Sequence, residues 1–195
     1  MDAIQSICNK CIWVHNGQIK AYGDTQKVIS SYAQYASGDA EITLSKRSDR
    51  QGTGKVKGKS FVVKNSIKTN RNLKFEIELM NNSDDTIKDI KISIDIFDSR
   101  LNQLSNIQNF LIGKKFDLKR GTNKLSIDIH NVNLVPGQYS INLFVASDQY
   151  NTEIFDWVEQ AAGFTVVPYD YYRQGDLPAY SGKFIYMDYT FNDQK

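Results

Sequence analysis

Two cysteines near the start of the chain are the first residues whose types and spacing could do chemistry. Cys8 and Cys11 are separated by two residues, the spacing of a redox pair or of half a zinc site. A structural zinc ion takes about four ligands, and the only histidines in the chain are His15 and His130. We therefore expect two packed thiols, with no metal ion and no cofactor. Nothing else in the chain could complete a disulfide framework, which favours a reducing compartment.

Closely spaced carboxylates are the second set. Asp95 with Asp98, and Glu76 with Glu78, could act as a general acid and base, since glycoside hydrolysis uses two carboxylates at a set separation. Acidic residues on alternating strands usually form a solvated face. No spacing singles out an acid and a base, so we expect no catalytic residues.

The segment Arg50-Gln-Gly52-Thr-Gly54 is the third candidate, because glycine-rich loops can cradle phosphates. A phosphate loop would continue into a helix carrying Lys-Ser, and none follows here. We interpret the segment as irregular backbone that leads into the first strand.

The composition is typical of a globular protein. The chain has 195 residues, of which 41% are hydrophobic and 24% charged, and its net charge is +2. This charge is too small to indicate nucleic acid or an anionic membrane as a partner. Neither a transmembrane-length apolar run nor a signal peptide is visible, so we expect a cytoplasmic protein.

From residue 55 onward, apolar and polar side chains alternate in segments separated by turn residues. This pattern predicts an all-β protein, an antiparallel sandwich of immunoglobulin or jelly-roll type. The expected strands are 56–67, 73–79, 90–97, 102–111, 125–130, 139–146, 154–167 and 183–191.

Residues 1–36 differ from this pattern. They predict a short helix, a hairpin that turns at Asn16-Gly17, and a second helix, and they hold too few apolar residues to fold alone. We expect a small α/β fragment over 1–36, a linker over 37–50 and the sandwich over 51–195.

The strand after Pro136-Gly137 has two unlike faces. We expect a type II turn with Gly137 at positive φ, followed by a core row that begins at Tyr139. The opposite row is polar but contains Phe144, and Phe97 is in the same position on strand 90–97. If the two strands share a sheet, these rows form one surface. If the face is covered by another strand or by a partner's strand, both phenylalanines are ordinary core residues.

Two ordered patterns resemble a known family. The first runs Ile7-Cys8-Asn-Lys-Cys-Ile12, then Val14-x-Asn16-Gly17-x-Ile19-x-x-x-Gly23-Asp24-x-x-x-Val28-Ile29-x-x-Tyr32. It resembles the tail of an ABC-transporter ATPase domain, in the segment that follows the switch histidine. The chain has no Gly-x-x-x-x-Gly-Lys-Ser/Thr loop, so we expect no ATP binding or hydrolysis by this chain.

The second pattern runs Arg50-x-Gly52-Thr53-Gly54, Asp95-Ile-Phe-Asp98, Leu134-x-Pro136-Gly137-x-Tyr139 and Phe155-Asp156-x-x-Glu159-x-Ala161-x-x-Phe164-x-Val166. It is similar to the C-terminal domain of the Wzt-type ATPase subunit, which belongs to the ABC exporter of O-antigen polysaccharide. In that subunit a β-sandwich follows the ATPase domain, in the order found here.

The resemblance implies a cytoplasmic module that binds the modified non-reducing end of a lipid-linked O-antigen glycan before export. It also implies a transmembrane exporter subunit as partner, which would hold the full-length transport ATPase at the inner membrane. Family members pair as homodimers with the terminal strand exchanged, which fits a detached strand 183–191. The alternative is a dimerisation or regulatory domain of the ATPase that binds no sugar.

A sugar site needs an aromatic platform beside hydrogen-bonding groups, because sugars present apolar C–H faces and hydroxyl edges. Asn109 is a secondary candidate for such a group, whereas we expect Tyr139 and Trp157 to be structural. The candidate carbohydrate-binding residues are Ser93, Asp95, Phe97, Asn106, Gln108, Ser140, Asn142 and Phe144.

Overall fold

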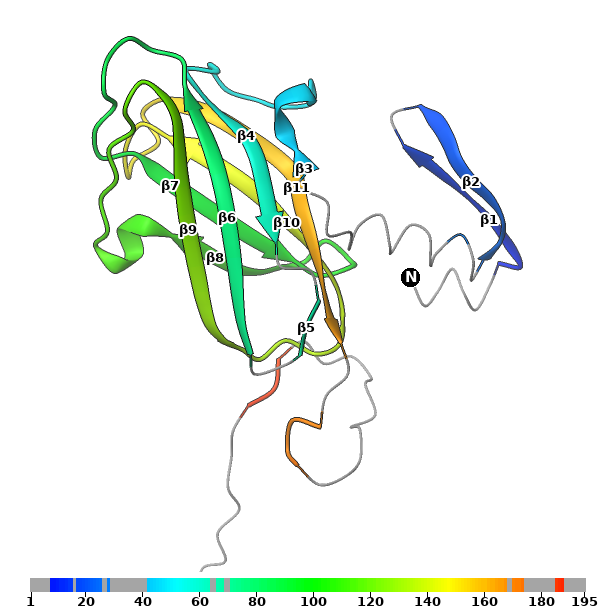
Figure 1. Ribbon diagram of the computed structural model, residues 1–195. Helices are drawn as coiled ribbons and strands as arrows, with labels where there is room; N and C mark the ends of the chain where they lie inside the picture. The colour runs from blue at the N-terminus through cyan, green and yellow to red at the C-terminus, as the bar shows by residue number, and fades with distance from the viewer. Residues whose placement is uncertain are drawn as a thin grey trace, which may run out of the picture.

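The computed structural model describes residues 8–15, 17–25, 28, 42–63, 66–68, 71–167, 170–173 and 185–187. Most of them form a sandwich of two β-sheets (Figure 1). The all-β fold class is confirmed. Among the described residues, the strand pairings are antiparallel apart from a short parallel pairing between β11 (Ile154–Val167) and β5 (Ser66–Lys68).

One sheet has five strands in the order β5-β11-β10-β7-β8, and the other has four in the order β3-β4-β6-β9. The five-stranded sheet comprises β5 (Ser66–Lys68), β7 (Lys91–Phe97), β8 (Gln103–Gln108), β10 (Gly137–Ala146) and β11 (Ile154–Val167). The four-stranded sheet comprises β3 (Ile42–Thr43), β4 (Val56–Val63), β6 (Arg71–Asn81) and β9 (Gly121–Val132). Two 3-10 turns, η1 (Leu44–Lys46) and η2 (Asn109–Ile112), flank β3 and β8.

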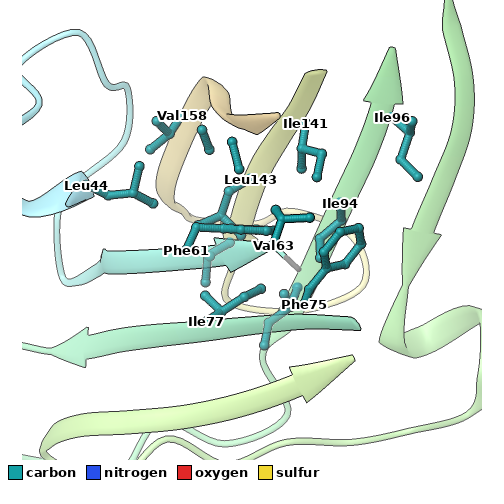
Figure 2. Packing of buried hydrophobic residues seen from close by; sticks show 14 of the residues in the cluster. Leu44, Phe61, Val63, Phe75, Ile77, Ile94, Ile96, Ile141, Leu143 and Val158 are labelled. Atoms are coloured by element: carbon teal, nitrogen blue, oxygen red, sulfur yellow. The ribbon is translucent and has the colours of Figure 1, made fainter. Parts of the chain in front are cut away.

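The core lies between the two sheets and is built from the inward row of each strand (Figure 2). Phe61 and Phe75 of one sheet meet Phe164 and Tyr139 of the other, with successive ring centroids 5.5, 6.5 and 5.3 Å apart. Leu143 is fully buried among them. The period-two alternation of the sequence is what supplies these inward rows.

Tyr139 is structural, as expected from the sequence. Its hydroxyl donates a hydrogen bond of 2.6 Å to the carbonyl oxygen of Val135, which ties the start of β10 to the preceding turn. Burial, together with the nearby charge of Asp98, raises the pKa of this phenol well above its usual range.

Three local predictions are wrong. The segment 56–67 is not one strand: β4 and β5 belong to different sheets, so the chain crosses the sandwich between them. Such a switch depends on tertiary packing and leaves no trace in the alternation. Segment 102–111 is shorter than expected, because β8 ends at Gln108 and η2 follows. Gly137 does not have a positive φ; it begins β10 and pairs with Val166.

The N-terminal hairpin is confirmed, with β1 (Lys10–His15) and β2 (Gln18–Asp24) paired around Gly17. Thr25 and Val28 are helical, and the Thr25 hydroxyl donates to the Cys8 carbonyl oxygen. The first helix, expected over residues 2–10, is wrong at its end: Cys8 and Asn9 are not helical and Lys10 begins β1. The rest of the two expected helices lies outside the described residues.

Most of the expected strand 183–191 also lies outside the described residues. Ile185 forms a bridge with Leu134 of the same chain, and the Tyr186 ring stacks on Tyr171 with centroids 4.6 Å apart. Exchange of this strand between two copies stays a prediction.

Candidate functional site

All eight candidate residues lie on one face of the five-stranded sheet, the face that points away from the core. This follows from the register of β8, β7 and β10, which are neighbours in that order. One cross-strand row places Gln108 opposite Ser93 and Ser93 opposite Phe144. The next row is Asn106, Asp95 and Asn142, and a third pairs Phe97 with Ser140. We call this surface the amide–aromatic face.

The two phenylalanines are not part of the core that this chain buries by itself. Phe97 and Phe144 are half-buried, whereas their neighbours Ile96 and Val145 are buried in the sandwich. Ser93 is the exception among the eight candidates, because its side chain is buried beneath its neighbours. The face therefore presents partly exposed rings beside polar groups.

A chain of amide hydrogen bonds fixes the polar part of the face. The Asn106 Nδ2 group donates to Ser93 Oγ at 2.8 Å and also to Asp95 Oδ1. Gln103 Nε2 donates to the same Asp95 oxygen at 3.0 Å, and Gln108 Nε2 donates to Asn106 Oδ1 at 2.6 Å. Because each amide is held by Asp95 or by a neighbouring amide, these groups are pre-organised, which lowers the entropy cost of binding a polar ligand.

The aromatic part of the face is a pair of rings. Phe144 lies directly opposite Trp157 of β11, and the two rings meet edge to face with centroids 6.2 Å apart. The ammonium group of Lys91 lies 5.8 Å from the Phe144 centroid. The pair forms an apolar platform at the level of Ser93 and Gln108.

Asn142 has a second task in this face. Its Oδ1 accepts a hydrogen bond of 2.8 Å from the backbone N–H of Gln160, which has a positive φ of 47°. The β10–β11 register shifts at this level. Asn142 thus supports a bulge in β11 as well as contributing to the surface.

Four residues differ from the prediction made from the sequence. Trp157, predicted to be structural, lies on the face, and Lys91 and Gln103 belong to the face without being among the predicted residues. The pairing of Trp157 with Phe144 depends on the bulge in β11, so simple alternation could not reveal it. Asn109 does not belong to the face: it is buried, and its side chain bonds the backbone of Ile90, Ile92 and Lys114.

The carboxylates have different surroundings from those of an acid–base pair. Asp95 accepts amide hydrogen bonds on the face, whereas Asp98 is buried and accepts from the backbone N–H groups of Arg100 and Asn102, each at 2.8 Å. Burial opposes ionisation of Asp98, but these hydrogen bonds and one from the Asn102 side chain outweigh it and lower the pKa. Asp98 therefore acts as a turn-forming anion.

A shallow hollow of about 370 Å³ lies on the outer face of the other sheet. Its lining carries charged groups: Glu78 forms an ion pair of 2.7 Å with Lys124 and lies 4.0 Å from Lys59, which is outside the lining. No aromatic ring lines it. We favour the amide–aromatic face as the site because it alone of the two combines rings with uncharged hydrogen-bonding groups.

Among the residues that the structure describes, no three His, Cys, Asp or Glu side chains gather in a way that could hold a metal ion. Within the same residues, no helix has the length and apolar character needed to cross a membrane.

Comparison with known proteins gives three findings. Residues 47–176 match the family model described as the Wzt C-terminal domain. The solved crystal structure of the C-terminal domain of Wzt superposes with a TM-score of 0.62 at 14% identity, covering 81% of this chain and 99% of that one. The teichoic acids export ATP-binding protein TagH of Bacillus anthracis is 29% identical over 49 residues, which are 25% of this chain and 9% of TagH.

Proposed function

Because the chain belongs to the Wzt C-terminal domain family, whose members are parts of ABC-exporter ATPase subunits, we propose that its sandwich binds the terminus of an exported polysaccharide. The binding surface in this proposal is the amide–aromatic face. Binding there would select the finished glycan for transport.

The observation that carries the proposal is the Phe144–Trp157 platform beside a fixed row of amides. The apolar C–H face of a sugar ring packs against aromatic rings, and its hydroxyl groups can exchange hydrogen bonds with Gln108 and Asn106. Carboxamides suit a neutral polar ligand, because they donate and accept without the desolvation cost of a charge.

The finer features of the proposal follow the family. We propose that the ligand is the modified non-reducing end of a lipid-linked O-antigen glycan. A neutral glycosyl group of a teichoic acid is the second candidate, which the name of the TagH relative supports. In this proposal the full-length protein is a transport ATPase that meets the glycan in the cytoplasm, at the inner membrane beside its transmembrane subunit, and this domain carries no enzymatic step of its own.

Calorimetric titration tests the proposal. The probe is cell-surface polysaccharide purified from the source organism, and the protein is the whole chain. Phe144→Ala removes half of the platform, and we expect it to weaken binding about tenfold, since stacking of a planar ring on an aromatic side chain is worth about 1–3 kcal/mol.

The matched control is Glu76→Gln, on the outer face of the four-stranded sheet, which should leave binding unchanged. Binding that is equally strong in the wild type and Phe144→Ala would contradict the proposed face. A folded wild-type chain that gives no heat with the polysaccharide would favour the sugar-free regulatory domain.

A further inference from the structure

We propose, resting on the proposed function, that Gln51 extends the glycan site beyond β11 and that a buried Arg50–Asp156 ion pair holds it there. The ligand would then be an oligosaccharide stretch that crosses the sheet, since a single sugar residue is too short to reach both ends of the site. Gln51 belongs to the segment 50–54. This segment precedes β4 and is not among the five strands of the sheet that carries the site.

The segment 51–54 behaves as a short extra strand along the N-terminal half of β11. Gln51 and Trp157 exchange two backbone hydrogen bonds. The Gln51 N–H donates to the Trp157 oxygen at 3.0 Å, and the Trp157 N–H donates to the Gln51 oxygen at 2.7 Å. Thr53 N–H donates to the Ile154 oxygen and Gly54 N–H to the Phe155 oxygen. The sheet therefore continues past β11 at the level of the aromatic platform.

The direct opposition of Gln51 and Trp157 places their side chains on the same side of the sheet. Residues that exchange both backbone hydrogen bonds in an antiparallel bridge face each other with Cα atoms about 5.5 Å apart. The cross-strand row thus runs Gln51, Trp157, Phe144, Ser93, Gln108. At about 4.8 Å per strand, four steps span about 19 Å.

Gln51 suits the end of such a row. Its side chain is exposed, and a carboxamide can donate and accept at once. It would meet hydroxyl or acylamino groups on the sugar residue next to the one stacked on Trp157. Gln108 has the same chemistry at the other end, so the row has an amide at each end and the two rings between them, with the Ser93 hydroxyl buried.

Gly52 explains how the segment comes so close to β11. A Cβ atom at Gly52 would lie 2.6 Å from the backbone oxygen of Phe155, and Gly52 has a φ of 117°. Only glycine is compatible with both conditions. The close approach of this segment to β11 therefore depends on glycine at position 52.

Arg50 and Asp156 fasten the same segment from inside. Arg50 Nε lies 3.4 Å from Asp156 Oδ1, an ion pair in which Asp156 is buried and the Arg50 side chain is 10% exposed. Neither of these two atoms makes a hydrogen bond, so the contact between them is electrostatic. The Arg50 Nη2 group donates to the oxygens of Leu44 and Gly58, each at 3.1 Å, and Gly58 N–H donates to Asp156 Oδ2 at 2.7 Å. Arg50 is thus a positioning residue for Gln51, with no ligand contact of its own.

The test titrates the whole chain with the purified cell-surface polysaccharide in a Trp13→Phe background. Trp157 is then the one tryptophan, and its fluorescence reports binding next to Gln51. Gln51→Ala should weaken binding about threefold to tenfold, the value of one hydrogen bond. Gln18→Ala, the same change on the hairpin strand β2, is the matched control and should have no effect.

A double-mutant cycle tests the role of Arg50. Arg50→Lys keeps the positive charge, but a single ammonium group cannot replace both the Nη2 hydrogen bonds to Leu44 and Gly58 and the Nε contact with Asp156. Binding should therefore weaken by a factor similar to that of Gln51→Ala. If Arg50 acts through Gln51, the double variant should bind no more weakly than the weaker single variant. Additive losses would overturn the positioning role, whereas equal binding by Gln51→Ala and Gln18→Ala would overturn the extended site.

The outcomes separate this inference from the function on which it rests. Loss of binding in Phe144→Ala with none in Gln51→Ala overturns only the extension of the site. Absence of binding by the wild-type chain overturns the proposed function and the extension together. A titration with the polysaccharide's component monosaccharides adds a third arm: affinity equal to that of the polymer would overturn the multi-residue ligand.

Discussion

At the scale of single residues, neighbours in β10 have opposite roles. Leu143 is fully buried between the sheets, and Phe144 is half-buried on the outer face. The sequence predicts this division, because strict alternation assigns the two side chains to opposite sides. It does not predict the partner of Phe144, since Trp157 is brought into register by a bulge that Asn142 and Gln160 stabilise.

Asp98 makes the stability of the folded chain depend on pH. Its folded-state pKa lies below the ordinary 3.8, so near and below that pH the unfolded chain binds more protons than the folded one. The stability that Asp98 contributes is therefore present above about pH 4 and is lost as the pH falls.

We expect Asp98→Asn to cost about 1 kcal/mol near neutral pH, because the amide still accepts the two backbone hydrogen bonds but without charge assistance. Urea unfolding at a series of pH values should show the wild type losing its advantage over the variant between about pH 5 and about pH 2. Parallel pH profiles for the two proteins would contradict this role for Asp98.

At the scale of elements, the alternation in the sequence locates strands well where both ends are marked by turns. β11 has the limits that the sequence predicts, Ile154–Val167. Prediction fails at 56–67, where hydrophobic residues continue while the chain changes sheets between β4 and β5. The order of the strands, the bridge between Gln51 and Trp157 and the hydrogen bonds among the amides are tertiary properties, which no local sequence pattern contains.

The segment 50–54 gives an element-scale prediction. Gly52→Ala should destabilise the sandwich by about 2 kcal/mol or more, since it combines an unfavourable φ with a backbone clash. Gly113→Ala is the control: Gly113 also has a positive φ, 66°, but no atom lies within 4 Å of the added Cβ, so about 1 kcal/mol is expected. Chemical unfolding measures the free energy of unfolding of both variants. Equal losses of stability would show that the contact between residue 52 and the Phe155 backbone adds nothing to the cost of the positive φ.

At the scale of the whole molecule, the hairpin and the sandwich have unlike surfaces. The hairpin exposes an apolar face, made of Ile12, Val14, Ile19 and Tyr22, each more than half exposed. This face is consistent with the resemblance of residues 7–32 to part of an ATPase domain. The sandwich buries its own core, and the family match over residues 47–176 contains nearly all of it.

Oligomeric state is a prediction at this scale. We expect a homodimer in which strand 183–191 is exchanged, because a long connection allows exchange at little cost. Removal of residues 183–195 should convert the dimer to a monomer in size-exclusion chromatography with light scattering. Circular dichroism of the shortened chain controls for folding, and a dimer that survives the truncation would contradict strand exchange.

The central claim is that the amide–aromatic face, and no other, binds glycan. The most direct measurement is a 15N–1H NMR titration of the whole chain with the purified cell-surface polysaccharide. We expect saturable shifts of the Trp157 indole N–H and of the backbone amides of β7, β8 and β10, with the amides of β4, β6 and β9 unchanged. Shifts confined to the four-stranded sheet, or no shifts at saturating polysaccharide, would contradict the claim.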